Sequence, residues 1–219
     1  MRSSWTRPWI AAAAVLAAAA VVVRTRASTL LQVEEPVMEW LLDGTDTSIW
    51  DRAAIFGANW LIIVGTIVLA VVGFIFEKRA GIAVVVTTLF AFVLTRFIRS
   101  IVGRAAPQEG LDSSFPSPEI VQAGVFWGLV VMMLWWLGAP RLIWQIALEL
   151  VVVIALVLSI RLLVAGEIWP SDAAGSAIVI ALSLITAAAA LEANPPGYFA
   201  RRLAEKAGSP DTQGTIVAT

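Results

Sequence analysis

The stretch AAIFGANWLIIVGTIVLAVVGFIF, residues 53–76, decides the fold class of this chain. Its 24 residues contain no charged side chain, and an apolar helix of about 20 residues is long enough to cross the roughly 30 Å hydrocarbon core of a bilayer. An amphipathic helix of a soluble domain would carry polar residues along one face, whereas only Asn59 and Thr66 interrupt this run. The sequence therefore predicts a membrane-spanning helix.

Five more apolar runs lie along the chain, at 8–23, 80–98, 120–138, 142–165 and 173–191. Hydrophobic residues make up 59% of the chain and charged residues 14%, as expected where lipid is the main solvent. We predict an all-α, polytopic membrane protein, a six-helix transmembrane bundle. It would form a single membrane domain over residues 1–219, with a flexible C-terminal tail at 193–219.

The first run also resembles the start of a secretory signal, because Arg2 and Arg7 precede it and alanine dominates it. No clear small-x-small cleavage site stands before Arg24. We therefore expect this run to remain in the protein as the first span.

Two residue types are missing from the chain, and both absences narrow its chemistry. Without cysteine there is no disulfide, thiol nucleophile or thiolate metal site. Without histidine there is no imidazole, the usual proton shuttle near neutral pH. The net charge is −1 with no long basic tract, which excludes a nucleic-acid-binding surface. We expect membrane lipids as partners, no cofactor and no metal, and the sequence specifies no protein partner.

The distribution of basic residues predicts the orientation of the bundle. Lys and Arg number eight on the side of the termini and seven on the other side. Four of those seven, Arg96, Arg99, Arg104 and Arg161, lie in or near a polar cluster and have another reason to be there. We therefore expect both termini in the cytoplasm. The alanine-rich composition and short loops favour a bacterial inner (plasma) membrane.

Polar residues collect in segments that fall on the side opposite the termini. An acidic connector at 24–52 carries a short surface helix over 30–42, and polar stretches follow at 99–119 and 161–172. The side chains that we expect to converge there are Arg99, Arg104, Ser117, Glu119, Arg161, Glu167 and Asp172. Guanidinium groups bind phosphate well through their planar fork of donors, so we predict a mouth that binds phosphorylated lipid.

Three segments carry a family resemblance: RSIVGRAAP at 99–107, FPSPE at 115–119 and RLLVAGEIWPSD at 161–172. Their order and spacing resemble the three signatures of the type 2 phosphatidic acid phosphatase family: Lys-x6-Arg-Pro, Pro-Ser-Gly-His and Ser-Arg-x5-His-x3-Asp. The resemblance implies the fold of a six-helix membrane phosphatase acting on lipid phosphates and diphosphates, with a core over about 50–192.

The resemblance also implies a role for each matching position. In the family the third-signature His attacks phosphorus, the second-signature His protonates the leaving group, and Lys and Arg hold the phosphoryl oxygens. The retained positions are Arg99, Ser117 and Asp172, and the substituted ones are Ala106 for an Arg, Glu119 for the acid and Ile168 for the nucleophile. Isoleucine has no lone pair, and losing general acid catalysis alone costs about 10²- to 10⁴-fold. We expect a catalytically inactive member.

Three functions remain open at this point. The first is an inactive family member that binds a phosphorylated lipid or a membrane partner at a basic extracytoplasmic mouth, through Arg99, Arg104, Arg161 and Ser117. The second is a lipid phosphate or isoprenyl diphosphate phosphatase with a non-standard carboxylate nucleophile, Asp172 or Glu167. The third is a transporter-like protein that works through an intramembrane carboxylate, Glu149.

Gln145 and Glu149 lie four residues apart, on one face of the run 142–165. An ionisable group inside the hydrocarbon region is costly, so Glu149 must face protein or water. Proton or ion passage is one reading. We favour the other, a protonated Glu149 that is hydrogen-bonded to a neighbouring helix.

Several of these residues also have a structural reading. Asp172 or Ser171 could cap the last helix, and Arg161 with Glu167 could form a buried ion pair. Close helix packing is what we expect of the small residues Gly124, Gly128, Gly175 and Ser176.

Overall fold

The computed structural model describes residues 6–43, 50, 52–107 and 114–191, and all regular structure in these ranges is helical. The elements are α1 (Thr6–Thr25), α2 (Ala27–Leu42), a 3₁₀ turn η1 (Arg52–Gly57), α4 (Asn59–Phe76), α5 (Lys78–Val102), α6 (Pro118–Trp136), α7 (Arg141–Val164) and α8 (Pro170–Leu191). Six stretches, of 18 to 25 residues, are long and apolar enough to cross a membrane. The six predicted spans are therefore confirmed.

The span boundaries differ from the prediction by up to six residues, and two of the differences have a local cause. The run at 53–76 begins as the turn η1, because Ala58 is extended and α4 starts only at Asn59. The span predicted at 80–98 extends over Lys78–Val102, and Gly103, in the left-handed region at φ +61°, ends it. The left-handed position that follows a helix is usually occupied by glycine, because a Cβ would strain the backbone there.

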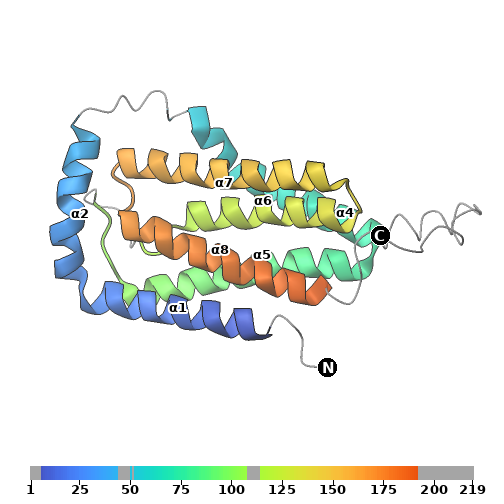
Figure 1. Ribbon diagram of the computed structural model, residues 1–219, viewed down its shortest axis with the longest axis horizontal. Coiled ribbons are helices and arrows are strands. Elements are labelled where there is room, and N and C mark those ends of the chain that lie inside the picture. The colour runs from blue at the N-terminus through green and yellow to red at the C-terminus, as the bar shows by residue number, and fades with distance from the viewer. Residues whose placement is uncertain (1–5, 44–49, 51, 108–113, 192–219) are drawn as a thin grey trace, which may run out of the picture.

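The long helices run side by side (Figure 1), with α6 at the centre, packed against α4, α5, α7 and α8. Gly124 and Gly128 allow α8 to approach: a Cβ would lie 2.3 Å from Cδ1 of Ile180 at the first and 2.5 Å from Cδ1 of Leu184 at the second. The predicted packing role of these glycines is confirmed.

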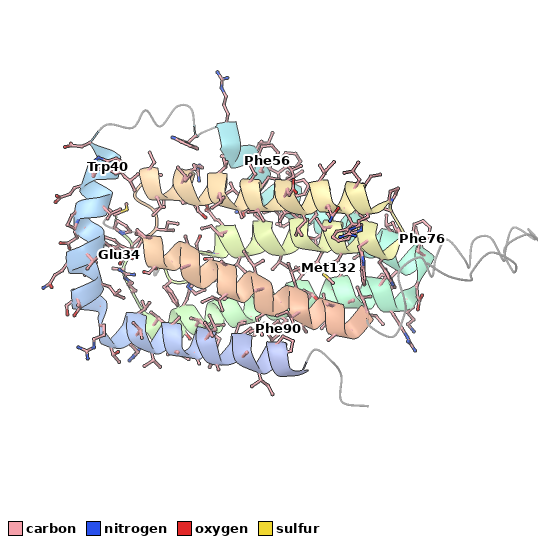
Figure 2. The ribbon with its side chains drawn as sticks, viewed as in Figure 1. Glu34, Trp40, Phe56, Phe76, Phe90 and Met132 are labelled. Carbon is pink, nitrogen blue, oxygen red and sulfur yellow. The ribbon has the colours of Figure 1, made fainter. Side chains whose placement is uncertain are left out.

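Helices α7 and α8 both pack on α6 but barely touch each other. An apolar groove of about 640 Å³ runs between them, with Ile120 and Gly124 of α6 among its lining residues. The outward faces of the spans carry large exposed apolar side chains throughout (Figure 2), for example Ile63 and Leu142. A water-exposed surface would not be built this way, and the chain is an integral membrane protein.

Helix α2 lies across one end of the bundle, transverse to the long helices (Figure 1). The sequence predicted only a surface helix in the connector. The outer side of α2 fits that description, since Trp40 is 77% exposed. Its inner side does not, because Glu34 and Met38 are 6% and 3% exposed. The helix therefore covers the bundle end at which α5 and α7 finish and α6 and α8 begin, which we call the covered end.

Candidate functional site

The centre of the covered end is Arg104. Because Gly103 turns the chain at the end of α5, the next side chain enters the bundle, where it is 5% exposed. Its guanidinium lies over the ring of Trp169, 5.1 Å from the ring centroid, and the indole Nε1 donates to the carbonyl of Ala105 at 3.0 Å. The arginine is thus held from two sides and cannot leave the bundle end without breaking these contacts.

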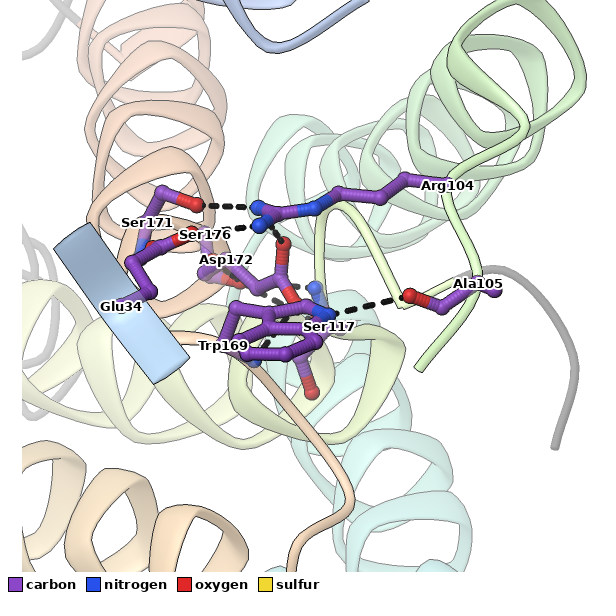
Figure 3. A network of polar contacts seen from close by, with 8 residues as sticks. All are labelled: Glu34, Arg104, Ala105, Ser117, Trp169, Ser171, Asp172 and Ser176. Atoms are coloured by element: carbon purple, nitrogen blue, oxygen red, sulfur yellow. Dashed lines mark hydrogen bonds and ion pairs between the residues drawn. The ribbon is translucent and has the colours of Figure 1, made fainter. Parts of the chain in front are cut away.

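Two carboxylates from distant parts of the chain meet this guanidinium (Figure 3). Nη2 of Arg104 donates to Oε2 of Glu34 on α2, and Nη1 lies 3.5 Å from Oδ1 of Asp172 on α8. Nη1 also donates to the hydroxyl of Ser171. A buried charge needs such partners, since an unpaired ion in a low-dielectric interior costs several kcal/mol.

Asp172 also holds the start of α8. Its Oδ2 accepts from the backbone N–H of Trp169 at 2.7 Å, and its own N–H donates to the Trp169 carbonyl at 2.9 Å. This reciprocal pairing satisfies backbone groups that a helix N-terminus leaves open, and Pro170 at the first helical position needs no N–H partner. The predicted capping role of Asp172 is therefore present, and the same carboxylate serves Arg104.

Ser117 lies beneath this network and is 2% exposed. Its backbone N–H donates to the hydroxyl of Ser176 at 2.9 Å, and that hydroxyl also contacts the carbonyl of Asp172 at 2.7 Å. A Cβ at the neighbouring Gly175 would lie 2.4 Å from the ring of Phe115. Gly175 and Ser176 thus bring α8 against the segment before α6, as the small-residue pattern predicted.

Arg161 forms a second, separate group at the covered end. Its Nη1 lies 3.8 Å from Glu119 and its Nη2 lies 3.7 Å from Glu167. A buried ion pair with Glu167 was one of the two roles that the sequence left open for Arg161. The pair is present, but its side chains are 22% and 30% exposed. Ion pairs of this kind contribute about 1 kcal/mol or less.

Arg99 belongs to a third group, on the last turns of α5. A cavity of about 130 Å³ lies there, lined by Phe92, Thr95, Arg96, Arg99, Pro118 and Gln122. The seven side chains expected to form one mouth therefore lie at one end of the bundle but in three groups. Arg104 is drawn inward by Glu34 and Asp172, which separates it from Arg99 and Arg161.

The structure is similar to the crystal structure of a transmembrane PAP2-type phosphatidylglycerolphosphate phosphatase from Bacillus subtilis, with a TM-score of 0.66 and 14% identity, over 90% of this chain and 96% of that one. The chain has the fold of a PAP2-type phosphatase. No protein-family model matches the sequence, and no curated protein does.

On this PAP2-type fold the three substituted positions have distinct surroundings. Ile168 is 3% exposed and packs in an apolar cluster with Ile120 and Leu162. Ala106 is 9% exposed, and the side chain of Glu119 is 45% exposed and paired with Arg161. The position that the resemblance assigns to the nucleophile is therefore filled by packed hydrocarbon.

Glu149 does not fit the expected inward-facing arrangement. Its side chain is exposed on the outside of α7, while Gln145 is half-buried, and no hydrogen bond or ion pair joins Glu149 to any residue in the described ranges. The buried face of α7 carries Ile154, Leu158 and Leu162. Glu149 stands nine residues before Leu158, which at about 100° per residue places it on the opposite side of the helix. The expected bond to a neighbouring helix is absent for this reason.

Glu34 is the site residue that the sequence reading missed, since it was counted only as part of an acidic connector. A signal was available. In α2, Leu30, Glu34 and Met38 follow each other at intervals of four and share one face of the helix. A carboxylate within an otherwise apolar stripe needs a buried cation as partner, and Arg104 is that cation.

Proposed function

We propose that this protein is a non-hydrolytic membrane protein of the PAP2-type fold that binds the head group of a phosphorylated lipid. The observation that carries the proposal is the pairing of an arginine-lined cavity at the covered end with a nucleophile position filled by Ile168. The cavity holds guanidinium groups that suit phosphate, and no residue of the chain can form a phosphohistidine.

We place the phosphate site at the cavity of Arg96 and Arg99, because two guanidinium groups line this one opening. Arg96 is exposed, with its guanidinium 5.4 Å from the ring centroid of Phe92, and Arg99 stands three residues later on the same face of α5. Both lie near the end of a membrane-spanning helix, at the level of lipid head groups.

The surroundings of the cavity favour a lipid ligand over a soluble phosphate. The cavity lies beside spans whose outward faces are apolar, so a diacyl lipid can present its head group while its chains stay in the hydrocarbon. The side opposite the basic-rich termini would then be extracytoplasmic, in a bacterial inner membrane with cytoplasmic termini.

A binding experiment tests this proposal. In nanodiscs or liposomes that contain phosphatidate, Arg96→Gln and Arg99→Gln should each weaken lipid binding about tenfold, because each removes a charge-assisted hydrogen bond to phosphate. Arg141→Gln is the matched control, since Arg141 is exposed at the opposite end of the bundle. Equal binding by all three variants and the natural chain would contradict the proposal.

Turnover is tested separately. Purified protein incubated with phosphatidate or an isoprenyl diphosphate should release no phosphate above a sample without protein, because the phosphohistidine route has no nucleophile. Multiple turnovers by the natural chain that Asp172→Asn abolishes would instead show a carboxylate nucleophile and end the non-hydrolytic reading.

A further inference from the structure

The contacts of Glu34 resemble those of a bound anion more than those of a structural ion pair. One oxygen, Oε1, accepts from the backbone N–H of Ser171 at 2.8 Å. The other, Oε2, accepts from the guanidinium of Arg104. Ser171 follows Pro170 in the first turn of α8, where backbone N–H groups point out of the helix and favour negative charge. Both carboxylate oxygens are thus held by donors suited to an oxyanion.

The donors belong to the long helices and the acceptor does not. Arg104 and Ser171 follow or begin membrane spans, and their positions are set by Trp169 and by the cap at the start of α8. Glu34 comes from α2, the helix that lies across the bundle end. The Nη atoms of Arg104 meet Glu34, Ser171 and Asp172. Within the described ranges only its Nε has no hydrogen-bond partner. Asp172 belongs to α8 and stays in place when α2 withdraws, so Glu34 is the one carboxylate that the cover contributes. The long helices thus supply the donors of this site, and α2 supplies the carboxylate that occupies it.

We infer that Arg104 and the N-terminus of α8 form an oxyanion site in which Glu34 is a tethered resident ligand. An external ligand with the same chemistry, a phosphate or a phosphomonoester head group, takes this place when α2 withdraws. Glu34 lowers the affinity for that ligand because the apparent affinity scales with the fraction of molecules whose site is free. This inference does not depend on the cavity at Arg96 and Arg99.

Charge removal at one position tests the inference. The full chain is placed in phosphatidylcholine nanodiscs and titrated with inorganic phosphate, followed by calorimetry. Glu34→Gln keeps the size of the side chain and removes its charge, and we expect it to bind phosphate about tenfold more tightly than the natural chain, or better. Glu35→Gln is the matched control, because Glu35 is the next residue and is exposed; it should bind as the natural chain does.

A second substitution assigns the gain to this site. Adding Arg104→Lys to Glu34→Gln keeps the positive charge but removes the fork of donors, and should remove most of the gain. If Glu34→Gln fails to fold, Glu34→Met, which is similar in length and also removes the charge, replaces it under the same criteria. A second set of nanodiscs with phosphatidate distinguishes a lipid head group from free phosphate, since a gain there alone identifies the lipid as the ligand.

Two results would overturn the inference. In the first, the folded Glu34 variant binds phosphate and phosphatidate no better than Glu35→Gln. In the second, the gain survives Arg104→Lys but is lost with Arg96→Gln, which would place the bound anion in the other cavity. The proposed function fails under a different result, equal phosphatidate binding by Arg96→Gln, Arg99→Gln and the natural chain, so the two failures are distinguishable.

Discussion

Arg104→Ala should lower the free energy of unfolding by about 3–5 kcal/mol, the usual loss when one partner of a buried charge cluster is removed. The substitution leaves Glu34 and Asp172 facing each other at side-chain exposures of 8% and 0%, with no cation between them. It also removes the group stacked on Trp169. Unfolding of the purified protein by heat or by added denaturing detergent, followed by circular dichroism, measures the loss.

Two comparisons separate this effect from a general loss of charge. Arg141→Ala removes an exposed arginine and should change stability by about 0.5 kcal/mol or less. The double variant Arg104→Met with Glu34→Gln should recover part of the loss, because replacing an ion pair by uncharged groups is far less costly than breaking it. An Arg104→Ala protein as stable as Arg141→Ala would mean that Glu34 and Asp172 are satisfied by water.

Gly175→Val should be the next most damaging change, with a loss of about 1–3 kcal/mol for overpacking a filled interior. A Cβ at this position would lie 2.4 Å from Cε2 of Phe115, a residue that is 1% exposed. The ring would have to move, and with it the segment that leads into Ser117. The same unfolding assay measures the effect.

The control for this prediction introduces the same side chain one residue earlier. Ala174 is exposed on α8, so Ala174→Val adds a valine where there is room and should alter stability by about 0.5 kcal/mol or less. If the two valine variants unfold together, α8 does not approach the Phe115 ring as closely as the structure indicates.

The sequence predicted the spans well because each span is indicated by the length and hydrophobicity of its own run of residues. Hydrocarbon thickness demands about 20 apolar residues, and runs such as 53–76 satisfy that demand without reference to the rest of the fold. The packing role of Gly124 and Gly128 followed from their spacing of four. The cap by Asp172 was equally local, since the carboxylate and the backbone N–H it accepts from lie three residues apart.

The site was harder to predict because its decisive contact is long-range. Glu34 and Arg104 are separated by 70 residues, and the hydropathy of α2 alone does not say that it crosses the bundle end. The sequence likewise did not determine how α7 is rotated about its own axis. The run at 142–165 is largely apolar on every side, so the outward position of Glu149 could not be predicted from it. The face of a span that contacts its neighbours is set by how the other helices pack. The sequence of that span alone does not contain this information.

The groove between α7 and α8 is a place where we expect lipids of the surrounding membrane to contribute to the packing of the protein. An empty space inside a hydrocarbon layer is unfavourable because the wall atoms lose dispersion contacts. We therefore expect acyl chains of nearby lipids to fill the groove of about 640 Å³, where they would complete the packing as side chains do elsewhere. Chain length and saturation should therefore shift the melting temperature, and a short-tailed detergent should lower it.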